Sequence, residues 1–140
     1  MDALQKLLIA DECERLSYNY ARWIDLGQAA RAAELFTDDA ELVLTAGPMV
    51  GREEIDSFFA KRQTAPVVSR HVITNVIVDV LGEQEASGMA YITFYRQPLG
   101  DQGPAPVAPP VSVGHYDDTY RLTAAGWRFS SRRSVVAFRS

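Results

Sequence analysis

Two histidines, His71 and His115, are the side chains best suited to move a proton near neutral pH. A histidine acts as a base when a buried carboxylate holds one ring nitrogen, because that bond fixes the tautomer and stabilises the imidazolium that forms. His71 lies near the start of a Val- and Ile-rich segment, and His115 follows Gly114 in a later one. An exposed or edge position is enough to explain His115, so His71 is the candidate base.

Tyr20 and Asp25 are two polar groups that could serve such a base, and both lie in the segment expected to form the first helix. Five residues on a helix correspond to a rotation of about 140°, so the two side chains cannot share one helix face. Both can line one cavity only if Asp25 occupies the last turn, which Gly27 permits. A solvated Asp25 is the alternative, but a carboxylate at a helix C-terminus is unfavourable and needs a reason. Tyr20 lies on an apolar stripe, where packing is the default, yet a buried phenol still needs a partner.

Five further side chains are candidates for contacts with a substrate. Arg96 stands near the end of a predicted strand and could bind a carboxylate or an oxyanion, or simply lie at the surface. Asn75 is an even number of residues from His71, so alternation places both on one sheet face unless Asn75 occupies a bulge. The remaining three are aromatic and could equally be packing residues: Trp23, Tyr116 and Tyr120.

Other kinds of site have little support in the sequence. Two histidines and one cysteine without close spacing do not form a zinc motif. The chain has no glycine-rich phosphate loop and no serine nucleophile motif. Asp117 and Asp118 are interpreted as a charged pair at a strand edge rather than a metal site. We therefore expect chemistry without a metal or cofactor.

Three helices are predicted to come first in the chain. The first runs from about Leu4 to Leu26, since apolar residues recur at spacings of three and four, and Gly27 stops it. The second covers roughly Ala29 to Phe36 and ends at a turn-rich cluster at 37–39. The third runs from Gly51 to about Arg62.

Strands are predicted to fill the rest. Two short ones cover Glu41–Thr45 and Met49–Val50. Four long ones, rich in β-branched and aromatic residues, then follow in hairpin succession: Val67–Leu81, Ala86–Gln97, Val111–Leu122 and Trp127–Phe138. Residues 98–110 hold five of the seven prolines and form a long loop, which suggests a lid or an oligomer contact. Helices followed by an antiparallel meander indicate an α+β fold, and a sheet that curls around its helices would leave a pocket.

Length and composition limit the function classes. A chain of 140 residues fits one domain, 1–140, and its net charge of −4 argues against a nucleic-acid partner. No apolar run is long enough to span a membrane, and the early acidic residues do not fit a signal peptide. A single cysteine, Cys13, fits a reducing cytoplasm. Acids dominate residues 1–60 and arginines dominate 121–140, so the two ends are expected to pair across one surface; an anion-binding strip is the alternative.

Six stretches, in order along nearly the whole chain, resemble the SnoaL-like branch of the NTF2-like superfamily. They are Tyr20-Ala-Arg-Trp-Ile-Asp25-Leu-Gly, Ala33-Glu-Leu-Phe36-Thr-Asp-Asp-Ala40, Gly51-Arg-Glu-Glu-Ile55, His71-Val-Ile-Thr-Asn75, Gly114-His-Tyr116-Asp-Asp118-Thr-Tyr120 and Gly126-Trp127-Arg-Phe129. The resemblance implies an α+β cone, with three N-terminal helices packed on a strongly curved, mainly antiparallel sheet. It also implies a dimer or trimer. The activity is less determined, because this fold hosts enzymes of several kinds and proteins that are not enzymes.

The resemblance also assigns roles to individual residues. Tyr20 and Asp25 match a Tyr and an Asp of bile-acid and scytalone-type dehydratases, and His71 matches their histidine. Hexachlorocyclohexane dehydrochlorinase is similar in having an Asp–His pair at the positions of Asp25 and His71. The groups that polarise the substrate differ: Arg96 replaces a histidine of scytalone dehydratases, Tyr120 falls near their asparagine, and Tyr20 replaces the dehydrochlorinase lysine.

Two classes of function follow from these assignments. The first is a cofactor-independent lyase or isomerase for a small hydrophobic cyclic molecule, in which His71 removes a proton from carbon, Asp25 orients His71, and Tyr20 stabilises an oxyanion or protonates a leaving hydroxyl. The second is a non-catalytic protein of the same fold that binds a small molecule, supports an assembly, or resembles the small subunit of ring-hydroxylating dioxygenases. An Asp25–His71 contact within about 3.2 Å beside a closed apolar cavity favours the enzyme. A cavity filled by the protein's own aromatic side chains favours the second class.

Overall fold

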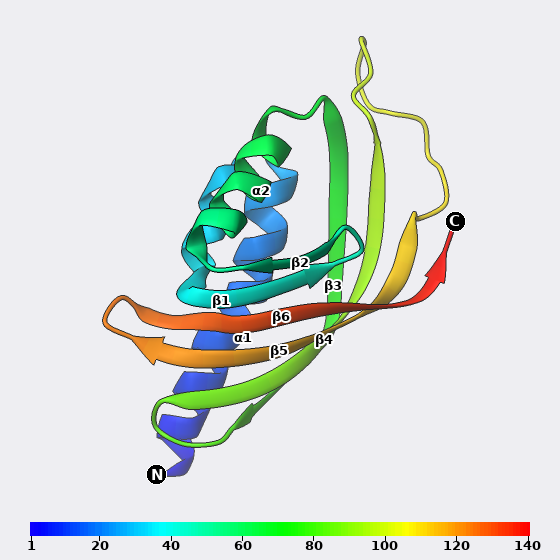
Figure 1. Ribbon diagram of the computed structural model, residues 1–140. Coiled ribbons are helices and arrows are strands. Elements are labelled where there is room, and N and C mark those ends of the chain that lie inside the picture. The colour runs from blue at the N-terminus through cyan, green and yellow to red at the C-terminus, as the bar shows by residue number, and fades with distance from the viewer.

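The computed structural model describes all residues from 1 to 140 (Figure 1). Three helical segments occur in the first half of the chain: α1 (Ala3–Asp25), the 3-10 helix η1 (Ala29–Leu35) and α2 (Arg52–Thr64). The strands are β1 (Phe36–Leu44), β2 (Gly47–Val50), β3 (Val67–Val80), β4 (Glu85–Pro98), β5 (Ser112–Thr123) and β6 (Gly126–Arg139). Every predicted helix and strand is therefore present, and the α+β class is confirmed.

The strands form one sheet in the order β2-β1-β6-β5-β4-β3. Neighbours pair antiparallel except β1 and β6, which run parallel, so the sheet is mixed. The long strands β3 to β6 are sequential neighbours, as expected for a meander. Figure 1 shows the helices gathered against one face of this sheet, with α1 in contact with β3 and β6.

The capping residues of α1 explain where that helix begins. The Asp2 carboxylate accepts the Gln5 backbone N–H at 2.8 Å, and the Gln5 side chain accepts the Asp2 backbone N–H at 2.9 Å. This capping box satisfies two N–H groups that would otherwise lack partners. Gly27, with φ of 87°, follows the helix in the left-handed region that glycine tolerates. The helix therefore ends at Asp25, so this carboxylate lies in the last turn, as its place in a shared site with Tyr20 requires.

The turn predicted at residues 37–39 is wrong, because these residues belong to β1. The Thr37 hydroxyl donates to the Asp39 carboxylate at 2.9 Å, and the pairing of β1 with β6 shifts register between Phe36 and Glu41. Residues that usually form turns thus form an irregular strand segment, in which the exposed Asp38 and Asp39 face solvent.

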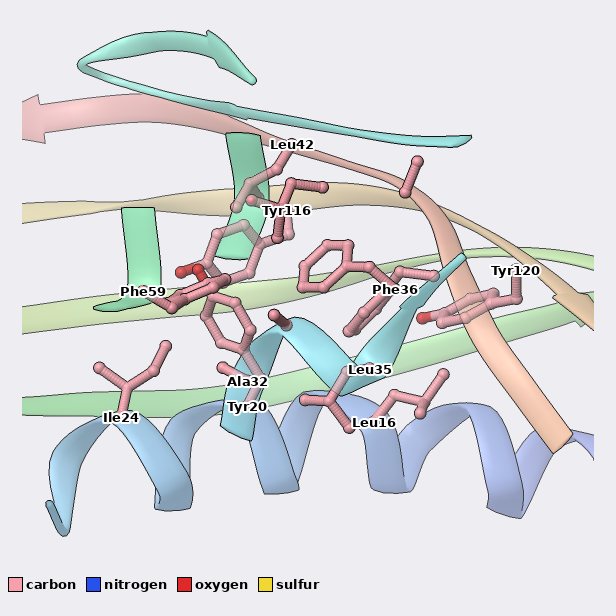
Figure 2. Close-up of a cluster of buried hydrophobic side chains, with 14 of the residues drawn as sticks. Leu16, Tyr20, Ile24, Ala32, Leu35, Phe36, Leu42, Phe59, Tyr116 and Tyr120 are labelled. Atoms are coloured by element: carbon pink, nitrogen blue, oxygen red, sulfur yellow. The ribbon is translucent and has the colours of Figure 1, made fainter. Parts of the chain in front are cut away.

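An aromatic cluster connects α1 to the sheet. Tyr20 packs edge-to-face on Phe36, Phe59, Tyr116 and Phe129, with ring centroids 5.9–6.4 Å apart. Figure 2 shows Tyr20 rising from α1 into the middle of this cluster, with Ile24 and Tyr120 toward its opposite ends. The core thus holds Tyr20, near the end of α1, in place against β1, β5, β6 and α2.

The proline-rich segment between β4 and β5 projects from one end of the sheet (Figure 1). It is tied back by the Gln97 side chain, which donates to the Pro106 carbonyl at 2.9 Å, and by the Val111 N–H, which donates to the Phe94 carbonyl at 2.8 Å. Elsewhere in the fold, none of the helices has the length and apolar character needed to cross a membrane.

Candidate functional site

Asp25 and His71 meet at the junction between α1 and β3. Their side chains form a 2.6 Å contact between His71 Nδ1 and Asp25 Oδ1. Both are largely withdrawn from solvent, with side-chain exposures of 9% for His71 and 6% for Asp25. Because Nδ1 faces a carboxylate, it carries the ring hydrogen and leaves Nε2 as the basic nitrogen. No protein group hydrogen-bonds Nε2, so it is free to accept a proton.

Two further hydrogen bonds hold the Asp25 carboxylate. It accepts the His71 backbone N–H at 2.6 Å and the Ser69 hydroxyl at 2.8 Å. Burial acts to raise the pKa of Asp25, but its bonds to His71 and Ser69 outweigh burial and leave that pKa below its ordinary value. Asp25 is therefore a carboxylate at neutral pH and can stabilise a charged imidazolium.

A cavity of about 460 Å³ lies beside His71. Ten of its seventeen lining residues are hydrophobic, including Ile24, Phe58, Phe59, Ile92 and Phe94. The Phe94 ring packs on the His71 imidazole, with centroids 4.5 Å apart. A volume of this size accommodates a small cyclic organic molecule.

A shallower hollow of about 350 Å³ lies on the other side of the pair, between α1 and β3. Asp25, Arg22 and Arg70 line this hollow, and His71 is the one residue that lines both spaces. His71 therefore borders both spaces, whereas Asp25 borders the hollow alone.

Tyr20 and Tyr116 bring two phenol groups to the cavity wall. Their rings pack edge-to-face with centroids 5.9 Å apart, and the Tyr20 ring lies 5.8 Å from the His71 ring. Burial raises the pKa of both phenols above the ordinary value, although the nearby Arg132 cation acts in the opposite direction. Both phenols remain protonated and can donate hydrogen bonds to a substrate oxygen.

Beneath these phenols lies a buried ion pair that the sequence interpretation missed. The Arg132 side chain is 0% exposed and donates to both Asp118 oxygens at 2.9 Å and to Ser17 at 2.5 Å. Its guanidinium also lies over the Tyr116 ring at 3.9 Å. The placement of Asp118 at a strand edge is therefore wrong; Asp118 is on the inner face of β5, directly across from Arg132 on β6. Strand alternation with Tyr116 and Tyr120 could have revealed this.

Ser69 and Arg62 also escaped the sequence interpretation. Ser69 is buried two residues before His71 on the same face of β3, and its hydroxyl accepts a hydrogen bond from Arg62 Nη2 at 2.8 Å. The spacing of two residues between Ser69 and the candidate base His71 could have predicted that both side chains lie on one face of the strand. The long-range pairing of acidic and basic ends is limited to one exposed pair, Arg121 with Asp39 at 3.1 Å.

Of the five predicted substrate contacts, the structure places Tyr116 and Arg96 in the cavity wall. Asn75 does not share the inner face with His71: it has a φ of 53° at a break in the β3–β4 register, and its side chain is exposed. Tyr120 is buried farther along β5, with its hydroxyl 3.4 Å from Asp118. Trp23 lies outside the cavity under the Arg31 guanidinium, at 4.0 Å. No residue of the 99–111 loop lines the cavity.

Comparison with protein families gives a match to the SnoaL-like domain over residues 5–133. This match covers all but the first two residues of α1, every cavity-lining residue except Ser134, and β6 as far as Arg133. A search of curated proteins finds no match.

Solved structures share the fold over almost the whole chain. A candidate scytalone dehydratase from Novosphingobium aromaticivorans superposes with a TM-score of 0.84 at 19% identity, covering 99% of this chain and 91% of that one. A hexachlorocyclohexane dehydrochlorinase of type 2 gives 0.79 at 17% identity, covering 99% and 92%. An NTF2-like protein with a cystatin-like fold, also from N. aromaticivorans, gives 0.78 at 21% identity, covering 98% and 87%.

Proposed function

Since the chain belongs to the family of SnoaL-like domains, we propose that it is a cofactor-independent lyase or isomerase of the dehydratase type. Its substrate is a small hydrophobic cyclic molecule, held in a cone-shaped pocket between the helices and a strongly curved sheet. The observation that carries this proposal is the 2.6 Å Asp25–His71 contact beside an unfilled cavity. A cavity packed with the protein's own aromatic side chains would instead have favoured a non-catalytic role.

The reaction begins with proton abstraction by His71. Nε2 takes a proton from a carbon next to a carbonyl group, and Asp25 stabilises the resulting imidazolium through Nδ1. The electron pair of the broken C–H bond forms a C=C bond as a hydroxyl on the next carbon departs. Tyr20 donates the proton with which that hydroxyl leaves as water, and the proton held by His71 Nε2 then restores the phenol, so both groups are regenerated and the elimination is balanced. In an isomerase, the proton would return to a different carbon of the same substrate.

Cyclic β-hydroxyketones test this proposal directly. With substrate in D₂O, His71-dependent abstraction is expected to exchange the acidic carbon proton for deuterium, and dehydration is expected to yield an enone that absorbs in the ultraviolet. Nuclear magnetic resonance and absorbance measure the two events separately. A binding protein of the same fold would bind members of the series without catalysing either event.

Tyr20→Phe is expected to lower kcat/KM by about 10²-fold, because one donor to the developing oxyanion or leaving group is lost. The effect is smaller than full loss of the base, since Tyr116 or water can partly replace the hydroxyl. Tyr18→Phe is a matched control, because Tyr18 is on the same helix and about half exposed. Equal activity of Tyr20→Phe and the wild-type chain would remove Tyr20 from the mechanism.

We also propose that the chain forms a dimer or trimer through the outer face of the sheet. Val72, Tyr91, Val135 and Phe138 are 36–72% exposed on the long strands. Alternation directs Tyr91 away from the helices, since its neighbours Ala90 and Ile92 are buried. Light scattering after size exclusion is expected to give two or three times the 15.5 kDa chain mass, and Tyr91→Arg is expected to reduce it. Leu7→Arg, at an exposed position of α1, is the control; a 15.5 kDa wild-type species would contradict the prediction.

A further inference from the structure

The residues that line the cavity include three cations and no carboxylate. Lys61, Arg62 and Arg96 are among its lining residues, whereas no Asp or Glu is. Asp25 is turned toward His71 and Ser69 and lines the outer hollow instead. An apolar cavity with unpaired cations at its wall is suited to a ligand that brings its own negative charge.

Two of these cations converge on one point. Arg62, in the last turn of α2, donates to the Ser69 hydroxyl at 2.8 Å. Arg96 is the direct partner of Ser69 in the β3–β4 pairing, so it also lies next to that serine. Burial, followed by repulsion from Arg96, lowers the pKa of Arg62, although the Asp25 carboxylate acts in the opposite direction. The repulsion agrees with two guanidinium groups in close proximity. The Arg96 side chain forms no ion pair or hydrogen bond with another residue.

We propose that Arg96 and Arg62 bind a carboxylate of the substrate, so that the substrate is a cyclic hydroxy acid or keto acid rather than a neutral ring. A planar guanidinium presents paired N–H donors that match the two oxygens of a carboxylate. Lys61, the third cation of the wall, adds positive potential without the same directional donors. This inference rests on the proposed function, because it takes the cavity beside His71 as the substrate site.

The strand geometry limits where the acid group sits on the substrate. Ser69 and His71 are two residues apart on one face of β3, which corresponds to about 7 Å along the strand. A carboxylate at Arg96 and an acidic carbon at His71 Nε2 are then separated by about the width of one ring. Phe94, the direct partner of His71 on β4, supplies an apolar surface for that ring.

Matched ligands that differ only in charge test the proposal by binding, without any turnover. We choose 2-naphthoate and its neutral analogue 2-naphthamide, with dissociation constants measured by titration calorimetry at low salt. The wild-type chain is expected to prefer the naphthoate by about tenfold or more, because charge-assisted hydrogen bonds are stronger than neutral ones. That preference is expected to shrink as salt is added. Arg96→Gln is expected to remove most of it, and Arg62→Gln part of it.

Arg133→Gln is the matched control, because Arg133 is exposed on β6 and does not line the cavity. Equal affinity for the two ligands, no binding of either at millimolar concentration, or a preference that survives Arg96→Gln would each overturn the proposal. So would an equal loss of preference in Arg133→Gln. His71→Ala is expected to keep the preference, so failed catalysis and failed anion recognition remain distinguishable.

Discussion

His71→Ala is expected to abolish turnover of any substrate that the wild-type chain converts, while the fold remains intact. The imidazole is the one group in the cavity wall whose free nitrogen can accept a proton near neutral pH while a carboxylate holds the other nitrogen. Loss of a general base removes about 10²–10⁴-fold of rate, and no neighbouring residue can replace it. The measurement is kcat/KM on the first converted hydroxyketone or hydroxyketo acid.

Asp25→Asn separates the two members of the pair. The asparagine amide can turn its NH₂ toward His71 and favour the wrong tautomer, and it cannot stabilise the imidazolium as a carboxylate does. We expect kcat to fall by orders of magnitude with a smaller change in KM, because the substrate contacts in the cavity remain.

His115→Ala is the control for both variants. His115 lies on β5, and its one ionic partner is Asp117, at 3.4 Å. Its replacement should leave kcat/KM within a small factor of the wild-type value. Circular dichroism and urea unfolding check that each variant is folded. Full activity of His71→Ala would end the assignment of the base and favour the binding-protein function.

The fold could be predicted from sequence because its signals are local and repeated. The helical spacing of the α1 apolar residues and the long Val- and Tyr-rich strands each determine one element, and their order determines the α+β class. Residues 37–39 were mispredicted because their turn preference is local, whereas their strand conformation depends on the residues on either side of them, Phe36 and Glu41, which pair with β6 about ninety residues away. Residue preferences do not reveal such distant pairing.

The candidate site was predictable only where a local sequence signal marks its residues. The resemblance identified His71, Asp25 and Tyr20, but strict alternation failed at Asn75, where a register break shifts the faces of β3. Core residues of β3 are therefore at odd positions before the break and even positions after it. Arg62 and Ser69 are only seven residues apart, but one belongs to α2 and the other to β3, so neither the helical nor the strand pattern indicates their hydrogen bond.

The buried Arg132–Asp118 pair leads to the largest expected effect on stability. Asp118→Asn preserves the shape of the side chain but leaves the Arg132 cation buried without a counter-charge. Arg132 Nη1 already lacks a hydrogen-bond partner in the wild-type chain. Removal of one member of such a pair destabilises a protein by about 3–5 kcal/mol. We expect a loss of that size in the free energy of unfolding, measured by urea titration at constant m-value.

Asp39→Asn is the matched comparison, because it breaks the exposed Asp39–Arg121 pair, in which the two side chains are 68% and 45% exposed. Solvent screens such a pair, so the expected loss is below about 1 kcal/mol. Replacing both buried partners, as Arg132→Met with Asp118→Leu, should recover most of the stability, since no unpaired charge then remains in the core. If Asp118→Asn were no more destabilising than Asp39→Asn, the buried pair would not stabilise the packing of β5 and β6. Tyr20 and Tyr116 would then be held in place by aromatic packing alone.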